Sequence, residues 1–267
     1  MGISDYLSSA WPDFIAHQIA PFGDLPVFLA PGNHELIPPM NRTEYLAQFA
    51  DWLETPVLRE QRLKDDAQDH KLRTYYHWVT GGVDFISLDN ASPEQFDSAQ
   101  LSWIRALINR DEKSDEIRSI VVGMHEALPG SLADAHSMSD SGTGQQTGRE
   151  VYEALLHAQN AAHKHVYVFA SHSHFYMEDV FRTDAWKGKV LPGWIVGTAG
   201  AQRYVLPKGV TQGSKAITNV YGYVVATVGV DGSISTAFQQ FMLDDLTKAN
   251  PGVPEPLVRW CYEENHQ

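Results

Sequence analysis

The stretch Phe28-Leu29-Ala30-Pro31-Gly32-Asn33-His34-Glu35 places an asparagine and a histidine directly after a short apolar run. The apolar run predicts a buried strand, and the proline and glycine that follow predict its end. Amide oxygens and neutral imidazoles bind borderline cations such as zinc, iron and manganese. We therefore interpret Asn33 and His34 as candidate site residues at the end of a strand.

Three further histidines follow apolar runs in the same way. They are His125, after residues 120–122, and His172 and His174, after residues 166–170. Side chains at the carboxyl ends of neighbouring strands meet at one edge of a sheet, which is where α/β folds build their sites. The pattern predicts that these histidines assemble with Asn33 into one metal centre.

The order and spacing of these motifs resemble the calcineurin-like metallophosphoesterase superfamily, and within it the purple acid phosphatases. The family pattern runs Gly-Asn-His-Asp/Glu, a single histidine at a strand end, then Gly-His-x-His. This sequence matches the blocks in that order at residues 32–35, at His125 and at residues 171–174, where Ser171 replaces the glycine. Weaker agreement at residues 85–89 and 100–103 extends the resemblance over most of the chain.

The resemblance implies a four-layer α/β/β/α sandwich that carries two divalent or trivalent ions of zinc, iron or manganese. It implies that Asn33, His125 and His172 bind one ion, that His174 binds the other, and that His34 donates a proton to the leaving alkoxide. Paired ions lower the pKa of water and clamp the attacking and leaving oxygens. The expected function of the complete domain, with all family blocks present, is hydrolysis of phosphate monoesters or diesters.

Two family blocks that precede Gly-Asn-His, namely Asp-x-His and Gly-Asp-x-x-Asp, have no counterpart in this sequence. Asp24 follows Gly23, but no aspartate lies three residues further on. Residues 4–19 are typical of the helix that follows Gly-Asp-x-x-Asp in the family. We therefore expect an amino-terminally incomplete phosphoesterase domain over residues 1–250, lacking its first strands, and a carboxyl-terminal tail over residues 251–267.

The missing blocks leave two other interpretations open. One is a degenerate phosphoesterase domain that binds one ion or none and acts as a metal-binding or interaction module. The other is a protein that stores metal or uses zinc structurally. An upstream sequence that contains both missing blocks would favour the enzyme.

Composition restricts the classes of partner. The chain has 267 residues, 43% of them hydrophobic, so it can bury a sizeable core. Its formal charge of −13 excludes broad attraction to nucleic acid, whereas a small phosphate ester stays compatible because bound cations reverse the local field. No apolar run is long enough for a membrane-spanning helix. The chain is expected to be soluble, and periplasmic or secreted if a signal peptide lies upstream; Cys261 permits no internal disulfide.

Local patterns predict further elements. They are helices over residues 43–54 and from residue 92 to residue 108, a solvated connector over residues 59–71, a hairpin of residues 75–79 and 83–88, a mobile glycine-rich loop or substrate lid over residues 137–148, and a hairpin of residues 221–230 and 233–241 that turns at Asp231-Gly232. We expect Glu35 to support its loop, His136 to be the least safely structural of the other histidines, and Trp260 to anchor the tail.

Overall fold

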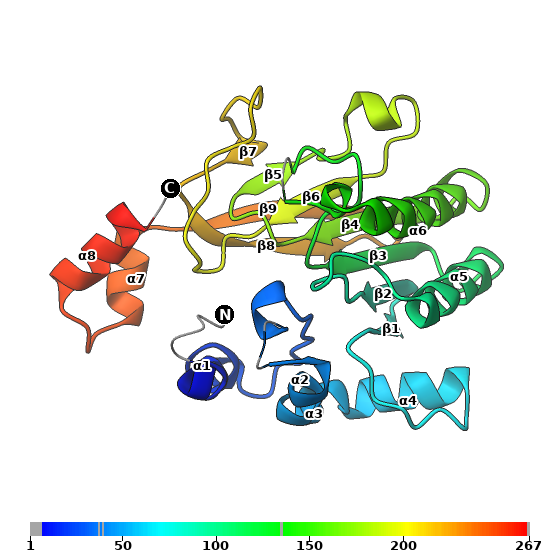
Figure 1. The fold of residues 1–267 in the computed structure, drawn as a ribbon, viewed down its shortest axis with the longest axis horizontal. Helices are drawn as coiled ribbons and strands as arrows, with labels where there is room; N and C mark the ends of the chain where they lie inside the picture. Colours follow the sequence, from blue (N-terminus) through cyan, green and yellow to red (C-terminus); the bar gives the residue numbers. More distant parts are fainter. Residues whose placement is uncertain (1–6, 37, 39, 134–135, 266–267) are drawn as a thin grey trace.

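The structure, a computed structural model, describes residues 7–36, 38, 40–133 and 136–265. Its main element is a seven-stranded mixed sheet with the order β1-β2-β3-β4-β6-β5-β7 (Figure 1). The strands are β1 (Tyr76–Thr80), β2 (Val83–Ser87), β3 (Ser119–Met124), β4 (His165–Ala170), β5 (Tyr176–Glu178), β6 (Gly193–Val196) and β7 (Ala216–Ile217). Strands β2, β3, β4 and β6 run parallel. The predicted α/β class is confirmed.

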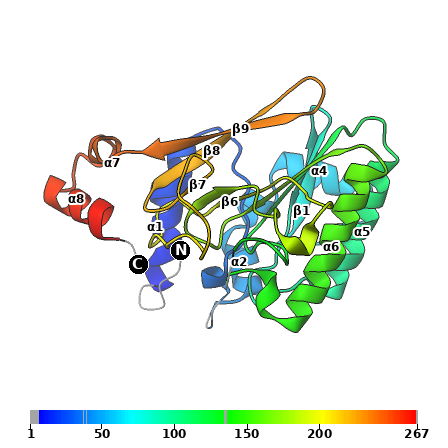
Figure 2. The ribbon, with the colours of Figure 1, turned by 90° about the horizontal axis from the view of Figure 1, so that it is seen from above.

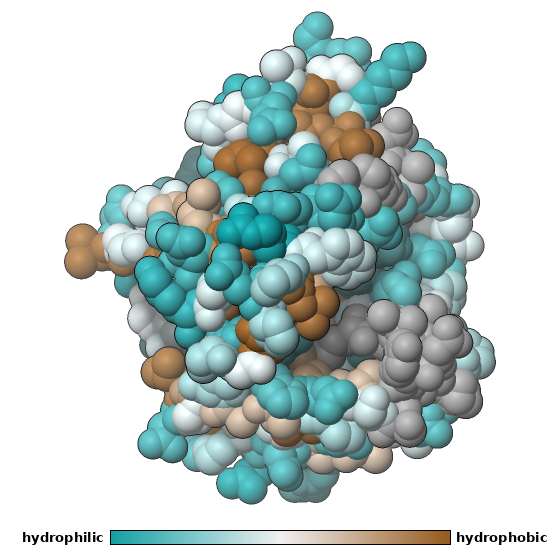
Figure 3. Space-filling model, turned by 90° about the vertical axis from the view of Figure 1, so that its left-hand side faces the viewer, coloured by the Kyte–Doolittle hydropathy of each residue, from teal (hydrophilic) through white to brown (hydrophobic). Residues whose placement is uncertain are grey.

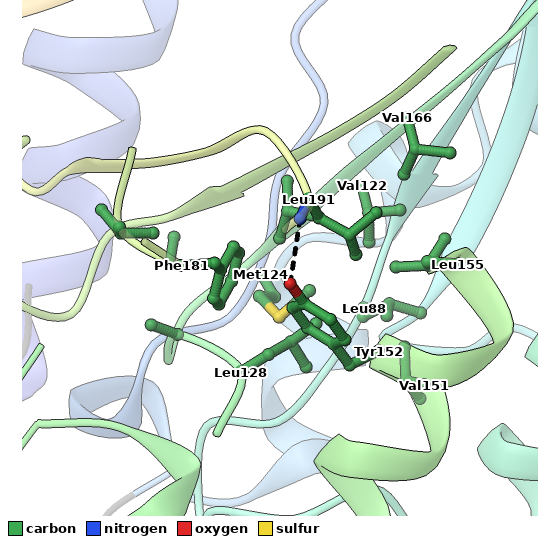
Figure 4. Packing of buried hydrophobic residues seen from close by; sticks show 14 of the residues in the cluster. Leu88, Val122, Met124, Leu128, Val151, Tyr152, Leu155, Val166, Phe181 and Leu191 are labelled. Atoms are coloured by element: carbon green, nitrogen blue, oxygen red, sulfur yellow. Dashed lines mark hydrogen bonds between the residues drawn. The ribbon is translucent and has the colours of Figure 1, made fainter. Parts of the chain in front are cut away.

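Two long helices, α5 (Ser98–Glu112) and α6 (Gly142–Asn160), lie side by side along one face of this sheet (Figures 1 and 2). Between α6 and the strands lies a core of fully buried side chains (Figure 4). In it the Tyr152 hydroxyl donates to Lys189 O and accepts from Leu191 N–H, both at 2.9 Å, and its ring stacks on Trp186. Because this core lies directly beneath β3 and β4, it fixes the strands whose ends carry the site.

The β8 (Tyr221–Val228) and β9 (Ile234–Phe241) hairpin forms a second, two-stranded sheet on the opposite side from α5 and α6 (Figure 2). The hairpin packs inward through the Phe238 ring, which stacks on Tyr176 at 4.4 Å between centroids. Its turn contains Gly232 at φ +88°, a conformation that favours glycine. The hairpin predicted around this turn is confirmed, as is the one formed by β1 and β2.

Helices α7 (Leu243–Ala249) and α8 (Glu255–Glu264) follow the hairpin and lie at one end of the molecule (Figure 1). The face at that end mixes hydrophilic and hydrophobic residues (Figure 3). Trp260, predicted to anchor the tail, is 60% exposed, so that prediction was wrong. The buried apolar side chain of α8 is Val258, which lies half a turn away on the inward face.

The amino-terminal part forms a smaller core of its own. Its helices are α1 (Leu7–Phe14), a π-helical turn (Ile15–Ile19), α2 (Arg42–Gln48), α3 (Ala50–Leu53) and α4 (Pro56–Asp65). The helix predicted over residues 43–54 exists as α2 and α3, with buried Phe49 between them. The solvated connector predicted over residues 59–71 was wrong in its first half, because burial of Leu58 and Gln61 stabilises α4.

The segment before Gly32 is extended but belongs to neither sheet, so the strand predicted there was wrong. Side-chain contacts hold it instead of a backbone ladder. The Phe28 ring stacks on Trp78 of β1 at 3.8 Å between centroids, and the Tyr76 hydroxyl donates to Leu29 O at 2.7 Å. These contacts to β1 carry Asn33 to the edge of the sheet.

Two more predictions differ from the structure. Helix α5 begins at Ser98 rather than near Ser92, because Asp97 caps it by accepting from Gln100 N–H at 2.8 Å. The glycine-rich stretch is not a loop throughout: from residue 142 it forms the first turns of α6. A Cβ on Gly148 would lie 2.5 Å from Pro129 Cδ, so this glycine permits close packing of the helix. In the part of the chain that the structure describes, no helix is long and apolar enough to span a membrane.

Candidate metal centre

The ends of β3 and β4 bring His125 and His172 together. His125 directly follows β3, and its carbonyl oxygen accepts hydrogen bonds from Ser171 N–H at 2.9 Å and from His172 N–H at 2.8 Å. The ladder between the strands runs up to the pair Met124 and Ala170. The two imidazoles are therefore placed by backbone geometry at the carboxyl edge of parallel strands, as the sequence predicts.

Three potential donor atoms converge at this edge. His125 Nε2 lies 3.0 Å from Asn33 Oδ1 and 2.8 Å from His172 Nδ1. Neighbouring donors at right angles around one ion, with bonds of about 2.1 Å, lie about 3 Å apart. The two imidazole nitrogens and the amide oxygen therefore fit the requirements of one borderline cation in both donor type and spacing.

The other two predicted residues lie outside this group. His174 Nδ1 lies 2.7 Å from Gln202 O, and its ring packs on Tyr204 at 4.2 Å between centroids. His34 is exposed and belongs to the 3₁₀ turn Asn33–Glu35. No three His, Cys, Asp or Glu side chains come together to hold an ion within the described residues, since the third converging donor is the Asn33 amide.

The convergent histidines are held neutral. Burial, followed by the neighbouring histidine charges, lowers the pKa of His125 to about 3. Burial also lowers the pKa of His172 to about 4, again with help from neighbouring histidines. His34 contributes to the lowered pKa of His125, His172 and His174, so it lies within electrostatic reach of all three. Neutral imidazoles keep the lone pairs that metal binding requires.

Glu35 and Gly32 shape the loop that presents Asn33. The Gly32 N–H donates to Glu35 Oε2 at 2.9 Å, in agreement with the predicted supporting role of this buried carboxyl group. A Cβ on Gly32 would lie 2.8 Å from Glu35 Oε2 and 3.2 Å from His125 Cε1. Only glycine therefore allows the loop to approach the His125 ring this closely.

Two residues near the site, Asn90 and Glu126, escaped the sequence reasoning, and a third, His136, was only noted as the least safely structural of the other histidines. Asn90 exchanges two hydrogen bonds with the backbone of Glu126, at 2.8 and 3.0 Å, and so fixes the residue after His125. Glu126 Oε1 lies 3.7 Å from His172 Nε2, and burial raises the pKa of Glu126 to about 8. His136 Nδ1 lies 3.3 Å from His172 Nε2. The available signals were the adjacency of Glu126 to His125 and the place of His136 near the glycine-rich stretch.

A family model for calcineurin-like phosphoesterases matches residues 3–176, more than half of the chain. The chain therefore belongs to the calcineurin-like phosphoesterase family, a class of hydrolases that use metal ions. The family predicted from the motifs is confirmed.

Solved structures resemble the chain only distantly. A purple acid phosphatase from yellow lupin (Lupinus luteus) seeds aligns with a TM-score of 0.43 and 16% identity, over 62% of this chain and 30% of its own length. A putative enoyl-CoA hydratase/isomerase from Acinetobacter baumannii aligns with a TM-score of 0.23 and 16% identity, over 36% of this chain and 39% of its own. A search of curated proteins found no significant match. TM-scores this low do not establish a shared fold, so membership of the family rests on the match to the family model.

Proposed function

We propose that the chain hydrolyses phosphate monoesters or diesters at a dinuclear centre built on the convergent group. Asn33, His125 and His172 hold one ion and His174 holds the second. The observation that carries the proposal is the approach of Asn33 Oδ1, His125 Nε2 and His172 Nδ1 to within 3.0 and 2.8 Å at a strand edge. Zinc, iron and manganese all suit these donors.

The protein contributes to the chemistry by positioning the metal-binding side chains and by keeping them uncharged. Bound divalent or trivalent ions would supply Lewis-acid activation of water and neutralise the charge of the phosphate. The chain holds His125 and His172 uncharged by burial, so that each ring keeps one lone pair near neutral pH. Asn33 adds an amide oxygen without adding charge, and its amino group is available to a phosphate oxygen. A small phosphate ester is the substrate class that these features suit.

His34 donates the proton that the leaving alkoxide requires. It follows Asn33 directly, is exposed to an incoming ester, and lies within electrostatic reach of all three other histidines. A proton donor acts only in the transition state, where it contributes about a hundredfold to ten-thousandfold. Loss of His34 should therefore lower turnover without loss of metal.

The experiment compares His125→Ala, His34→Ala and the exposed control His157→Ala. Zinc and manganese binding is measured calorimetrically, and turnover is measured with para-nitrophenyl phosphate and bis(para-nitrophenyl) phosphate. We expect His125→Ala to lose metal and turnover, and His34→Ala to keep metal and lose turnover, least with good leaving groups. Equal metal loss in both variants would refute the division of roles.

A second candidate is a metal-binding module without turnover. It is favoured by one observation: within the described residues three neutral donors converge, and His174 is not among them. Tight binding of a single ion with no hydrolysis of either ester, with zinc or with manganese, would select this candidate over the hydrolase.

A further inference from the structure

Arg203 is a buried cation, and each of its three guanidinium nitrogens donates a hydrogen bond. The side chain of this residue, which is 3% exposed, donates from Nε to Asn265 O at 3.1 Å, from Nη1 to Asn219 O at 3.1 Å, and from Nη2 to Tyr262 O. It also lies 4.6 Å from the centre of the Tyr221 ring. A buried charge requires hydrogen-bond partners, and the three separate nitrogens of a planar guanidinium group can each donate to a different carbonyl.

Two of these acceptors belong to the end of α8. Tyr262 lies in its last turn and Asn265 is its C-cap residue. The last carbonyls of a helix lack partners within the helix and carry partial negative charge, so a cation stabilises them. The Arg203 backbone N–H also donates to Asn265 O, at 3.0 Å. Arg203 therefore fastens the end of α8 to the loop that contains it.

The neighbours of Arg203 in that loop hold His174. The Gln202 carbonyl oxygen lies 2.7 Å from His174 Nδ1, and Tyr204 N–H donates to His174 O at 3.0 Å. The Tyr204 ring packs on both His174 and His136. A carbonyl oxygen only accepts, so a neutral His174 in this contact carries its proton on Nδ1 and leaves the Nε2 lone pair free.

We propose that Arg203 is a positioning residue for His174, and that α8 is thereby part of the scaffold of the metal centre. The hydrogen bonds from Arg203 to the last carbonyls of α8 fix residues 202–204 and with them the Gln202 carbonyl. This carbonyl in turn selects the His174 tautomer. Histidine ligands are commonly fixed by such a hydrogen bond from the other ring nitrogen. This inference rests on the proposed function only for the role of His174 as a ligand.

The test reads the His174 tautomer in the metal-free full chain by long-range proton–nitrogen correlation spectra. The signals are assigned with His174→Gln and recorded at about pH 8, above the ordinary histidine pKa. We expect wild type to show a protonated Nδ1 and an unprotonated Nε2. In Arg203→Met both nitrogen shifts should move toward the average of two exchanging tautomers. Arg203→Lys should behave like Arg203→Met, because one ammonium cannot reach all three carbonyls.

Two controls separate positioning from general stability. Asn265→Ala removes the side-chain hydrogen bond to Tyr221 but keeps the backbone carbonyl that Arg203 uses. Tyr152→Phe loses hydrogen bonds in the core far from the loop. Both should keep the wild-type His174 shifts.

An unchanged His174 tautomer in folded Arg203→Lys or Arg203→Met would overturn the proposal. So would a protonated Nε2 in wild type, a result that needs no variant to fold. A tautomer shift in the Arg203 variants of a chain without hydrolysis would support the positioning role while refuting the proposed hydrolase.

Discussion

At the carboxyl ends of β3 and β4, His125 and His172 face each other and the Asn33 amide, whereas on the edge strand β1 the ring of His77 lies between two carboxylates. His77 Nδ1 is 2.8 Å from Asp84 Oδ1, and its Nε2 faces Asp65. Both ring nitrogens of His77 face acceptors, so both carry protons. One sheet therefore holds the same residue type in opposite charge states at two places, a neutral site at the ends of β3 and β4 and a charged site around His77.

The difference comes from the neighbours and not from burial, because burial lowers the pKa of both kinds of histidine. Against that effect, hydrogen bonds to Asp65 and Asp84 raise the pKa of His77 to about 9. His125 has other histidines beside it, and its pKa falls. A charged, paired histidine ties elements together, whereas a neutral histidine beside neutral donors retains the lone pair for an ion. Charge state thus distinguishes a structural histidine from a candidate ligand.

The largest effect should come from removing one histidine from each site. His172→Ala should weaken zinc binding more than a hundredfold, beyond the tenfold to hundredfold typical of outer-shell changes, because a donor atom itself is lost. It should leave the thermal transition near that of wild type. His77→Ala should do the reverse. Calorimetric zinc titration and thermal unfolding of both variants test this, and metal loss in His77→Ala would break the comparison.

Asp84→Asn tests the charged site around His77 alone. Asp84 is fully buried and contacts both His77 and Arg110, which both also contact Asp65, so removal of its charge weakens the shared network without leaving either cation unpaired. Loss of a hydrogen bond to a charged group costs about 1.5–3 kcal/mol, which denaturant unfolding would measure. Glu263→Gln, which breaks an exposed pair with Arg259, is the matched control and should cause no measurable loss. Equal losses in the two variants would mean that the buried charge of Asp84 contributes no more to the free energy of unfolding than an exposed charge does.

Sequence alone could predict the neutral site because its residues follow a repeated signal: apolar runs, then histidines, in a recognisable order. It could not predict the charged site around His77. His77, Asp65 and Asp84 come from three elements, and α4, which carries Asp65, was mistaken for a connector because its helix depends on tertiary burial of Leu58 and Gln61. Likewise, Asn90 and Glu126 lie 36 residues apart, and only the folded sheet makes them partners.

The dependence of stability on pH should distinguish the charged site from the neutral site further. The folded pKa of His77 is raised from 6.5 to about 9, so its contribution is fully present below pH 6.5 and is lost as pH rises through 9. The shift corresponds to about 3 kcal/mol. The free energy of unfolding of wild type minus that of His77→Gln should fall by this amount over that window. A difference that is constant from pH 6.5 to above 9 would show that His77 is not a charged partner.

The smallest expected effect concerns Glu126. Like the partners of His77 it is a carboxyl group, but it lies beside His172 in the neutral site. Glu126 Oε1 lies 3.7 Å from His172 Nε2, beyond hydrogen-bond distance, and burial raises the pKa of Glu126 to about 8, so near neutral pH it is largely uncharged. It therefore orients His172 weakly and does not charge it. Glu126→Gln keeps the size and neutrality of the group, so zinc affinity should fall by about tenfold at most, the lower end for residues that orient a ligand. Glu126→Ala, which also removes the packing, should cost more. If Glu126→Gln abolished zinc binding as His172→Ala does, Glu126 would be a charged partner, and the contrast between the neutral site and the charged site would not hold.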